Sequence, residues 1–145
     1  MHQTLNKFGY PATLLREFEH WCVLLRPSQV TLGALVLVAK SDATSMAALP
    51  LEAFADLHNC CTCIDTALRQ FRNFDKLNYL ALMMVDPQVH FHVLPRYAKD
   101  QVFEGIVFKD LAWPGPPDLK TTIDISDTCR STLHQALTLT FANAA

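Results

Sequence analysis

The stretch from residue 86 to residue 96 places the strongest constraint on this chain. Apolar and polar residues alternate in it from position 88 to position 93. Because a β-strand sends successive side chains to opposite faces, the alternation predicts a strand with two unlike faces. The polar face carries Gln88, His90 and His92, and the apolar face carries Val89, Phe91 and Val93. The apolar face would anchor the strand to a core and hold two imidazoles in one row, where a substrate could meet them.

The His-x-His spacing alone leaves other interpretations open. Two histidines can share a half-buried strand face without any function. Neighbouring in-phase imidazoles can also bind zinc or a similar ion, provided that a third ligand is present. The chain contains no His-Glu-x-x-His and no paired Cys-x-x-Cys pattern, and its sequence does not place His20, His58 or His134 near the pair. We therefore expect no metal site.

The composition fits one domain over residues 1–145. Half of the residues are apolar and 18% are charged. A chain of this length buries roughly two thirds of the surface that its unfolded form exposes, so it needs neither a metal nor a disulfide to be stable. The formal net charge of −2 gives no basic footprint for nucleic acid. We expect a small-molecule partner and no DNA or RNA.

The sequence carries no signal for export or for a membrane. Residues 1–11 lack the apolar run of a signal peptide, and no later stretch is long and charge-free enough to span a bilayer. The five cysteines are odd in number and have no scaffold-like spacing, so free thiols are expected. On a helix Cys60 and Cys63 share a side and Cys61 points elsewhere, which favours core residues over a metal cluster. We expect a cytoplasmic protein.

Apolar runs and turn signals predict the strands around the histidine pair. Strands are expected at residues 19–25, 32–39 and 77–85. The run 32–39 is nearly all apolar, which predicts a central strand with both faces covered. Because Asp86-Pro87 is a turn signal, strand 77–85 should form a tight antiparallel hairpin with the histidine strand.

Two segments have helical periodicity. Pro50 suits the first turn of a helix that runs to about residue 71. Its apolar stripe is predicted to consist of Phe54, Leu57, Cys61, Ile64, Leu68 and Phe71. A second helix is expected from about residue 126 to 141, capped by Ser126 or Asp127, with one side formed by Cys129, Leu133, Leu137 and Phe141. Residues 1–18 are predicted to be irregular or partly helical, and residues 98–122 to be a loop packed on the surface.

Residues 88–96 resemble the signature of the histidine triad (HIT) nucleotide hydrolases and transferases, His-φ-His-φ-His-φ-φ, where φ is apolar. All of the φ positions match, and two of the three histidines do. The similarity covers roughly residues 14–97, and residues 113–117 lie outside it. It implies an α+β, HIT-like fold with an antiparallel sheet of about five strands, a long packing helix and a C-terminal helix. It also implies a homodimer that needs no cofactor.

Through this resemblance His90 falls on the nucleophile, which attacks the α-phosphorus of a nucleoside phosphate ester, anhydride or phosphoramidate. The main-chain carbonyl of Gln88 is expected to hold the other ring nitrogen of His90. His92 matches the residue that hydrogen-bonds the phosphate or leaving-group oxygens. Gln88, Asn78 and Arg96 are candidates for further substrate contacts, although a structural role is equally open for Asn78 and Arg96.

Gln88 and Ala34 depart from the pattern of the family, because relatives have histidine at the first triad position and many have it after Gly33. Gln88 can still form hydrogen bonds but does not carry a proton. A tight hairpin would also leave no room for the phosphate-binding loop of relatives. The leading hypothesis is an enzyme acting on a nucleotide or dinucleoside polyphosphate. The alternatives are a nucleotide-binding protein with weakened catalysis and a protein that holds a metal through His90, His92 and a distant ligand.

Overall fold

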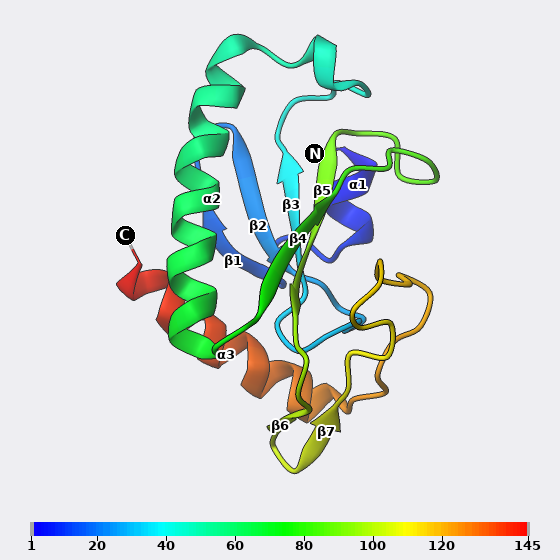
Figure 1. Cartoon of the computed structure of the whole chain (residues 1–145). Coiled ribbons are helices and arrows are strands. Elements are labelled where there is room, and N and C mark those ends of the chain that lie inside the picture. The colour runs from blue at the N-terminus through cyan, green and yellow to red at the C-terminus, as the bar shows by residue number, and fades with distance from the viewer. Residues whose placement is uncertain (1, 145) are drawn as a thin grey trace.

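The computed structural model describes residues 2–144, which form helices and strands arranged as shown in Figure 1. In chain order they are α1 (Gln3–Lys7), β1 (Leu14–Glu17), β2 (Trp21–Leu25), β3 (Leu35–Ala39), the 3-10 turn η1 (Met46–Ala48), α2 (Leu51–Phe71), β4 (Lys76–Leu80), β5 (His90–Arg96), β6 (Gln101–Phe103), β7 (Ile106–Phe108) and α3 (Asp127–Asn143). Five strands form an antiparallel sheet in the order β1-β2-β3-β5-β4, and β6 and β7 form a separate hairpin. The predicted α+β class is confirmed.

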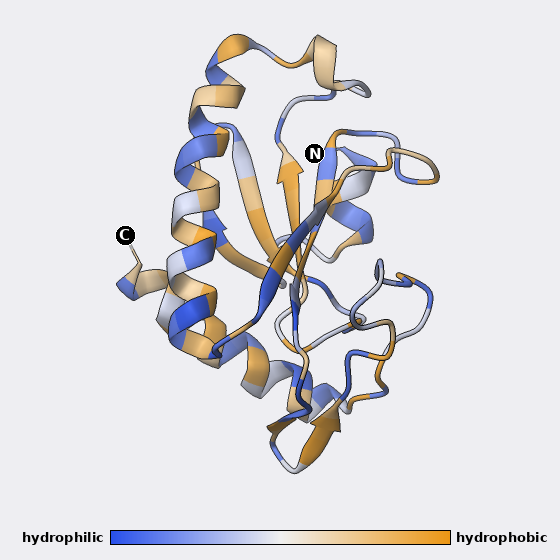
Figure 2. Ribbon diagram, in the orientation of Figure 1, coloured by the Kyte–Doolittle hydropathy of each residue, from blue (hydrophilic) through white to orange (hydrophobic). Residues whose placement is uncertain are grey.

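The centre of the sheet is β3, as its apolar sequence predicts. All five of its residues are buried, as are all five of β2. Figure 2 shows hydrophobic colours gathered on these central strands. On its other side β3 pairs with β5, so that Val38 is opposite His90 and Val36 is opposite His92. The histidine strand is therefore an interior strand, fixed on both edges by β3 and β4.

The two faces of the sheet have different covers. The larger core lies between one face and the helices α2 and α3, and it includes Val89 and Val93 with Phe91 packed against it. On the opposite face, α1 packs its Leu5 and Phe8 against apolar side chains of β2 and β3. The rings of both triad-type histidines contact Phe8, so they lie on this second face. The predicted alternation of β5 is confirmed.

The C-terminal helix follows its prediction closely. The Ser126 hydroxyl accepts a hydrogen bond from the backbone nitrogen of Cys129 at 3.0 Å, which caps α3. All members of its predicted apolar side are buried, namely Cys129, Leu133, Leu137 and Phe141.

The packing face of α2 differs from the predicted stripe. The helix begins after Pro50 as expected, but its buried residues are Ala53, Cys60, Cys63, Ile64, Ala67 and Leu68. Phe54 is 38% exposed, and Leu57, Cys61 and Phe71 are half-buried. Leu57 and Phe71 still pack against the core, so the predicted stripe is confirmed for them and for Ile64 and Leu68, and it is wrong for Phe54 and Cys61. Small side chains let the helix approach the sheet closely, so the buried face combines alanines and cysteines with Ile64 and Leu68, and Phe54 lies at the flank.

The predicted antiparallel pairing with the histidine strand is confirmed by β4 and β5, but the predicted tight turn between the two strands is wrong. Strand β4 ends at Leu80, and residues 81–89 form a loop that extends past the sheet beside α1 (Figure 1). Met83 has a φ of 46°, which turns the chain out of the extended conformation. Pro87 has no amide hydrogen to give to a ladder. An ion pair between Lys7 and Asp86, 3.0 Å long, joins the loop to α1.

Two short strand regions were missed. The segment before β2, predicted to be irregular or partly helical, contains the helix α1 but also the strand β1. The segment 98–122 begins with the β6–β7 hairpin and becomes irregular only in its proline-rich second half.

The described cysteines are all free, and Cys60 and Cys63 are buried whereas Cys61 is not. None of the helices described between residues 2 and 144 has the length and apolar character needed to cross a bilayer.

Candidate active site

The pleat of β5 brings the two imidazoles together on the second face of the sheet. The ring centroids of His90 and His92 are 5.1 Å apart. The Phe8 ring lies 5.8 Å from the His90 ring and 5.7 Å from the His92 ring. With residue exposures of 2% and 6%, both histidines are held by their surroundings and have little freedom to turn.

The hydrogen bond of His90 determines which of its ring nitrogens is reactive. Its Nδ1 lies 2.7 Å from the backbone oxygen of Gln88, and this is the contact expected from the family resemblance. A carbonyl oxygen only accepts hydrogen bonds, so Nδ1 must carry the ring proton. The lone pair of the neutral ring is therefore on Nε2, for which residues 2–144 offer no hydrogen-bond partner. The folded backbone thus leaves Nε2 as the ring nitrogen with a free lone pair.

His92 is kept uncharged by its position. The pKa of His92 is lowered to about 4, mainly by burial and then by repulsion from His90 and Arg26, which Asp86 only partly opposes. At neutral pH the ring is consequently neutral and can donate only one N–H. Its Nδ1 is buried and has no hydrogen-bond partner among the described residues. His92 is thus suited to donate a hydrogen bond to a phosphate oxygen, but it is a poor proton donor.

The lowered pKa of His92 predicts a loss of stability in mild acid. The unfolded chain protonates this residue near its ordinary pKa of 6.5, whereas the folded chain does so only near 4. Between these values the unfolded state binds more protons, so stability falls as the pH falls from 6.5 toward 4. We expect His92 to contribute a loss of about 2 kcal/mol in the free energy of unfolding by about pH 5.

Urea unfolding of wild type and His92→Gln at about pH 7.5 and pH 5 measures this difference. Equal pH dependence in the two proteins would contradict the assignment, and His58→Gln, on the exposed side of α2, is the control.

A cleft of about 290 Å³ opens beside the histidine pair. Its lining comes from five parts of the chain: the end of α1, the segment after β2, the loop after β4, strand β5, and residues 119–120. The lining residues are Lys7, Phe8, Arg26, Leu82, Met84, Val85, Asp86, His90, His92, Leu119 and Lys120. The site therefore has two imidazoles, an apolar wall and three cationic side chains.

These three cations are functional candidates that sequence reasoning missed. Lys7, Arg26 and Lys120 are far apart in the chain, and each stands in a segment without a recognisable motif. Only the packing of α1 and of residues 119–120 against the histidine face brings them to one cleft. No local signal could have identified them.

The backbone oxygen and the side-chain oxygen of Gln88 both form hydrogen bonds within the protein. Its backbone oxygen holds His90, and its side-chain Oε1 accepts hydrogen bonds from Thr4, at 2.5 Å from the hydroxyl and 3.3 Å from the backbone nitrogen. Gln88 does not line the cleft. The amide therefore ties the start of β5 to α1, and the substrate contact of Gln88 stays a prediction.

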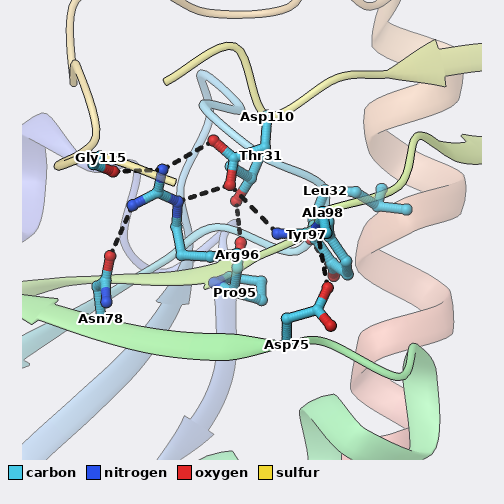
Figure 3. A network of polar contacts seen from close by, with 10 residues as sticks. All are labelled: Thr31, Leu32, Asp75, Asn78, Pro95, Arg96, Tyr97, Ala98, Asp110 and Gly115. Atoms are coloured by element: carbon cyan, nitrogen blue, oxygen red, sulfur yellow. Dashed lines mark hydrogen bonds and ion pairs between the residues drawn. The ribbon is translucent and has the colours of Figure 1, made fainter. Parts of the chain in front are cut away.

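Asn78 and Arg96 also lie away from the cleft, in the polar network of Figure 3. Arg96 donates to both carboxylate oxygens of Asp110, at 2.6 and 2.9 Å, and to Asn78 Oδ1 at 2.8 Å. It also donates to the backbone oxygen of Gly115 at 2.9 Å. The side chains of Arg96 and Asp110 are only 4% and 3% exposed. Of the two roles left open by the sequence, the structural one fits these contacts.

The Arg96 network anchors the segment that completes the cleft. Asp110 and Gly115 attach residues 110–115 to the end of β5, and Leu119 and Lys120 follow shortly after. A bridge between Gln29 and Ile123 fixes the segment again further on. A second cavity of about 310 Å³ lies along this segment and contains neither histidine. Of these two cavities, only the smaller is lined by the histidine pair.

The departure from the family at Ala34 falls outside the cleft. Ala34 is fully buried and packs with Val30 and Leu94. The described residues contain no group of three or more His, Cys, Asp or Glu side chains arranged to hold a metal ion. His90 and His92 thus have no third ligand beside them in residues 2–144.

Comparison with known proteins gives similarity in structure only. No protein-family model and no curated protein matches the sequence. Among solved structures, a histidine triad protein from Marinobacter aquaeolei VT8 is 23% identical, with a TM-score of 0.74 over 100% of this chain and 97% of its own. A histidine triad protein from Bradyrhizobium japonicum is 22% identical, with a TM-score of 0.73 over 97% of this chain and 96% of its own.

A more distant structure shares the same architecture. It is described as a hypothetical histidine triad nucleotide-binding protein from Sulfolobus tokodaii strain7 and is 15% identical, with a TM-score of 0.68 over 90% of this chain and 84% of its own. At such identities the likeness establishes the fold. The chain therefore has the histidine triad fold, as the motif in β5 predicted.

Proposed function

We propose that this histidine triad fold is an enzyme that transfers a nucleotidyl group to His90 and then to water or another acceptor. The observation that carries the proposal is the hydrogen bond from His90 Nδ1 to the Gln88 carbonyl, 2.7 Å long, which leaves the Nε2 lone pair free at a cleft. Without it the ring could turn or adopt the other tautomer, and the nucleophile would be lost.

In the first step Nε2 of His90 attacks the α-phosphorus of the bound substrate. A nitrogen–phosphorus bond forms, the bond from phosphorus to the leaving group breaks, and the leaving group takes the electron pair of that bond. Attack by the neutral form of the ring leaves a positive charge on the ring of the nucleotidyl-histidine, which Nδ1–H shares with the Gln88 carbonyl. This charge makes the ring a good leaving group for the second step.

In the second step the oxygen of a water molecule attacks the same phosphorus. The nitrogen–phosphorus bond breaks, its electron pair returns to Nε2, and a nucleoside monophosphate is released together with a proton from the water. His92 supports both steps by donating a hydrogen bond to the reacting phosphate. Its ring lies 5.1 Å from that of His90, on the same strand, so the two side chains can act on one group.

A nucleotide as substrate agrees with the lining of the cleft. Cationic side chains suit a phosphate, and Phe8, Leu82 and Met84 offer apolar surface to a nucleoside. The similar structure from Sulfolobus tokodaii is described as nucleotide-binding. In this scheme Gln88 positions the nucleophile, and Asn78 and Arg96 position the wall formed by residues 119–120.

Detection of the covalent intermediate tests the proposal. The protein is mixed with a dinucleoside polyphosphate or a nucleoside phosphoramidate and quenched early. Intact-mass measurement should reveal one added nucleotidyl group, and peptide mapping should place it on His90. If nucleotides bind tightly but neither turnover nor an adduct is found, the second function, a nucleotide-binding protein with weakened catalysis, is the correct one.

We further propose that the chain forms a homodimer through β4 and α2. Strand β4 is at the edge of the sheet, and Cys61 of α2 lies beside its Tyr79. Phe54 and Leu57 continue the same side of the helix and are not buried. A second copy could pair with the open edge and cover this apolar flank.

The dimer predicts a solution mass of two chains in analytical ultracentrifugation. Phe54→Lys should shift the protein toward the monomer, because it places a charge in the covered flank. Glu52→Lys changes an exposed residue at the start of the same helix and should leave the mass unchanged. A single-chain mass for the wild type would contradict this proposal.

A further inference from the structure

We propose that Arg26 and Lys120 form a second anion site in the cleft, which selects substrates with an anionic leaving group. The preferred substrate class is then a nucleoside phosphoanhydride, rather than a phosphoramidate or an ester of a neutral alcohol. This inference rests on the proposed function and specifies which of its substrates the chain prefers.

The charges along the cleft exceed what the reacting phosphate needs. Lys7, Arg26 and Lys120 line it, and Asp86 is its single carboxylate among the described residues. Asp86 already pairs with Lys7 at 3.0 Å. Arg26 and Lys120 therefore face the cleft without a carboxylate within salt-bridge distance in residues 2–144. One phosphodiester charge at the α-position would leave a positive charge unmatched, which favours a ligand with a further anionic group.

Arg26 is held in the cleft by neutral partners only. Its Nη1 donates to the backbone oxygen of Ser28 at 2.5 Å, and its Nη2 lies 3.4 Å from the backbone oxygen of Leu119. Its Nε is buried without a partner, and burial lowers the pKa of the guanidinium. Burial of a cation without a counter-charge lowers the free energy of unfolding. An anion in the cleft would offset that cost.

The two buried unpaired side-chain atoms found in residues 2–144 belong to neighbours in this cleft. They are Arg26 Nε and His92 Nδ1. Native proteins pair nearly all buried polar groups, and the exceptions gather at functional sites. The incomplete bonding of both residues supports a role for Arg26 together with the histidine pair.

Lys120 reaches the cleft through the segment that the Arg96 network anchors. The Asp118 carboxylate accepts hydrogen bonds from the Lys120 backbone nitrogen at 3.0 Å and from the Thr121 hydroxyl at 2.8 Å, which shapes the chain at this point. The contact of Arg26 with the Leu119 carbonyl places the two cations on adjoining walls. The side chain of Lys120 is exposed and free to reach a bound anion.

The chemistry of the site agrees with this selection. An amine or alkoxide leaving group must receive a proton as its bond to phosphorus breaks, whereas a phosphate departs as a stable anion. The site is poor in proton donors, because Gln88 does not titrate and the pKa of His92 is lowered to about 4. It contains two cationic side chains, Arg26 and Lys120, that form no salt bridge in residues 2–144 and can stabilise a departing anion. As His90 Nε2 bonds to the α-phosphorus, the bridging oxygen takes the electron pair of the broken bond, and Arg26 and Lys120 neutralise the resulting phosphate.

The experiment compares two substrates with the same nucleoside, a dinucleoside tetraphosphate and a nucleoside phosphoramidate of a neutral amine. Wild type should have the higher kcat/KM on the tetraphosphate. Lys120→Gln should lower that kcat/KM by about tenfold, the effect of losing one charged contact, and should affect the phosphoramidate much less. Arg26→Gln should lower it by at least as much, with its melting temperature measured to separate binding from folding.

Lys109→Gln is the matched control, because Lys109 is an exposed lysine of the same segment that lines only the second cavity and pairs with Asp100. It should leave kcat/KM for both substrates unchanged.

A wild-type preference for the phosphoramidate, or equal losses of kcat/KM on both substrates in Lys120→Gln, would overturn the second anion site while the proposed function stands. If neither substrate is cleaved, calorimetry decides: a nucleoside diphosphate should bind about tenfold more tightly than the monophosphate, and Lys120→Gln should remove the difference. Equal affinities would then overturn it.

Discussion

Replacing His90 by alanine is expected to lower kcat for nucleotide cleavage by a factor of at least about 10⁴, because the covalent route through Nε2 is closed. The substitution removes the only ring in the cleft whose Nδ1 is held by a backbone carbonyl among the described residues. Binding should change far less, since the cations and the apolar wall remain. The measurement is steady-state turnover with a titration of a nucleoside monophosphate under the same conditions.

Two further variants separate loss of the nucleophile from general damage. His58→Ala removes an exposed imidazole on α2 and should leave turnover unchanged. His90→Gly leaves space in which added imidazole can take the place of the missing ring and restore part of the activity. Undiminished cleavage in His90→Ala would refute the assigned nucleophile, and the adduct would then have to be sought elsewhere.

Replacing Asp110 by alanine should destabilise the fold by about 3–5 kcal/mol, because it leaves the Arg96 guanidinium buried without its counter-charge. Both side chains are almost fully buried, and Asp110 also accepts a hydrogen bond from the Tyr97 backbone nitrogen at 3.2 Å. The variant should release residues 110–120 from the end of β5 and weaken nucleotide binding through the displaced Lys120. Urea unfolding measures the first effect, and calorimetry measures the second.

The exposed ion pair between Lys109 and Asp100, 3.7 Å long, provides the control. Asp100→Asn should change the free energy of unfolding by less than about 1 kcal/mol, since solvated pairs contribute little. If Asp110→Ala lowered the free energy of unfolding by no more than Asp100→Asn does, the network in Figure 3 would not anchor residues 110–120.

Patterns repeated within a few residues were sufficient to predict several elements. The period of two in β5 predicted which side chains share a face, and the period near 3.6 in α3 predicted its buried residues correctly. The apolar run of β3 predicted the central strand. The fold class and the histidine pair follow from these elements, because secondary-structure geometry relates neighbouring side chains without reference to the rest of the chain.

Other features depend on contacts between distant segments, which no local pattern encodes. The apolar sequence of residues 81–85 is typical of a strand, yet it forms a loop that joins α1 through Asp86 and Lys7. The sequence alone does not distinguish a phosphate-binding role of Arg96 from a structural one, because its partner Asp110 is identified only by the fold. Arg26 and Lys120 become part of one cleft only through the packing of the chain. Long side chains can serve as ligands or as anchors, and the partner within reach determines which role they have.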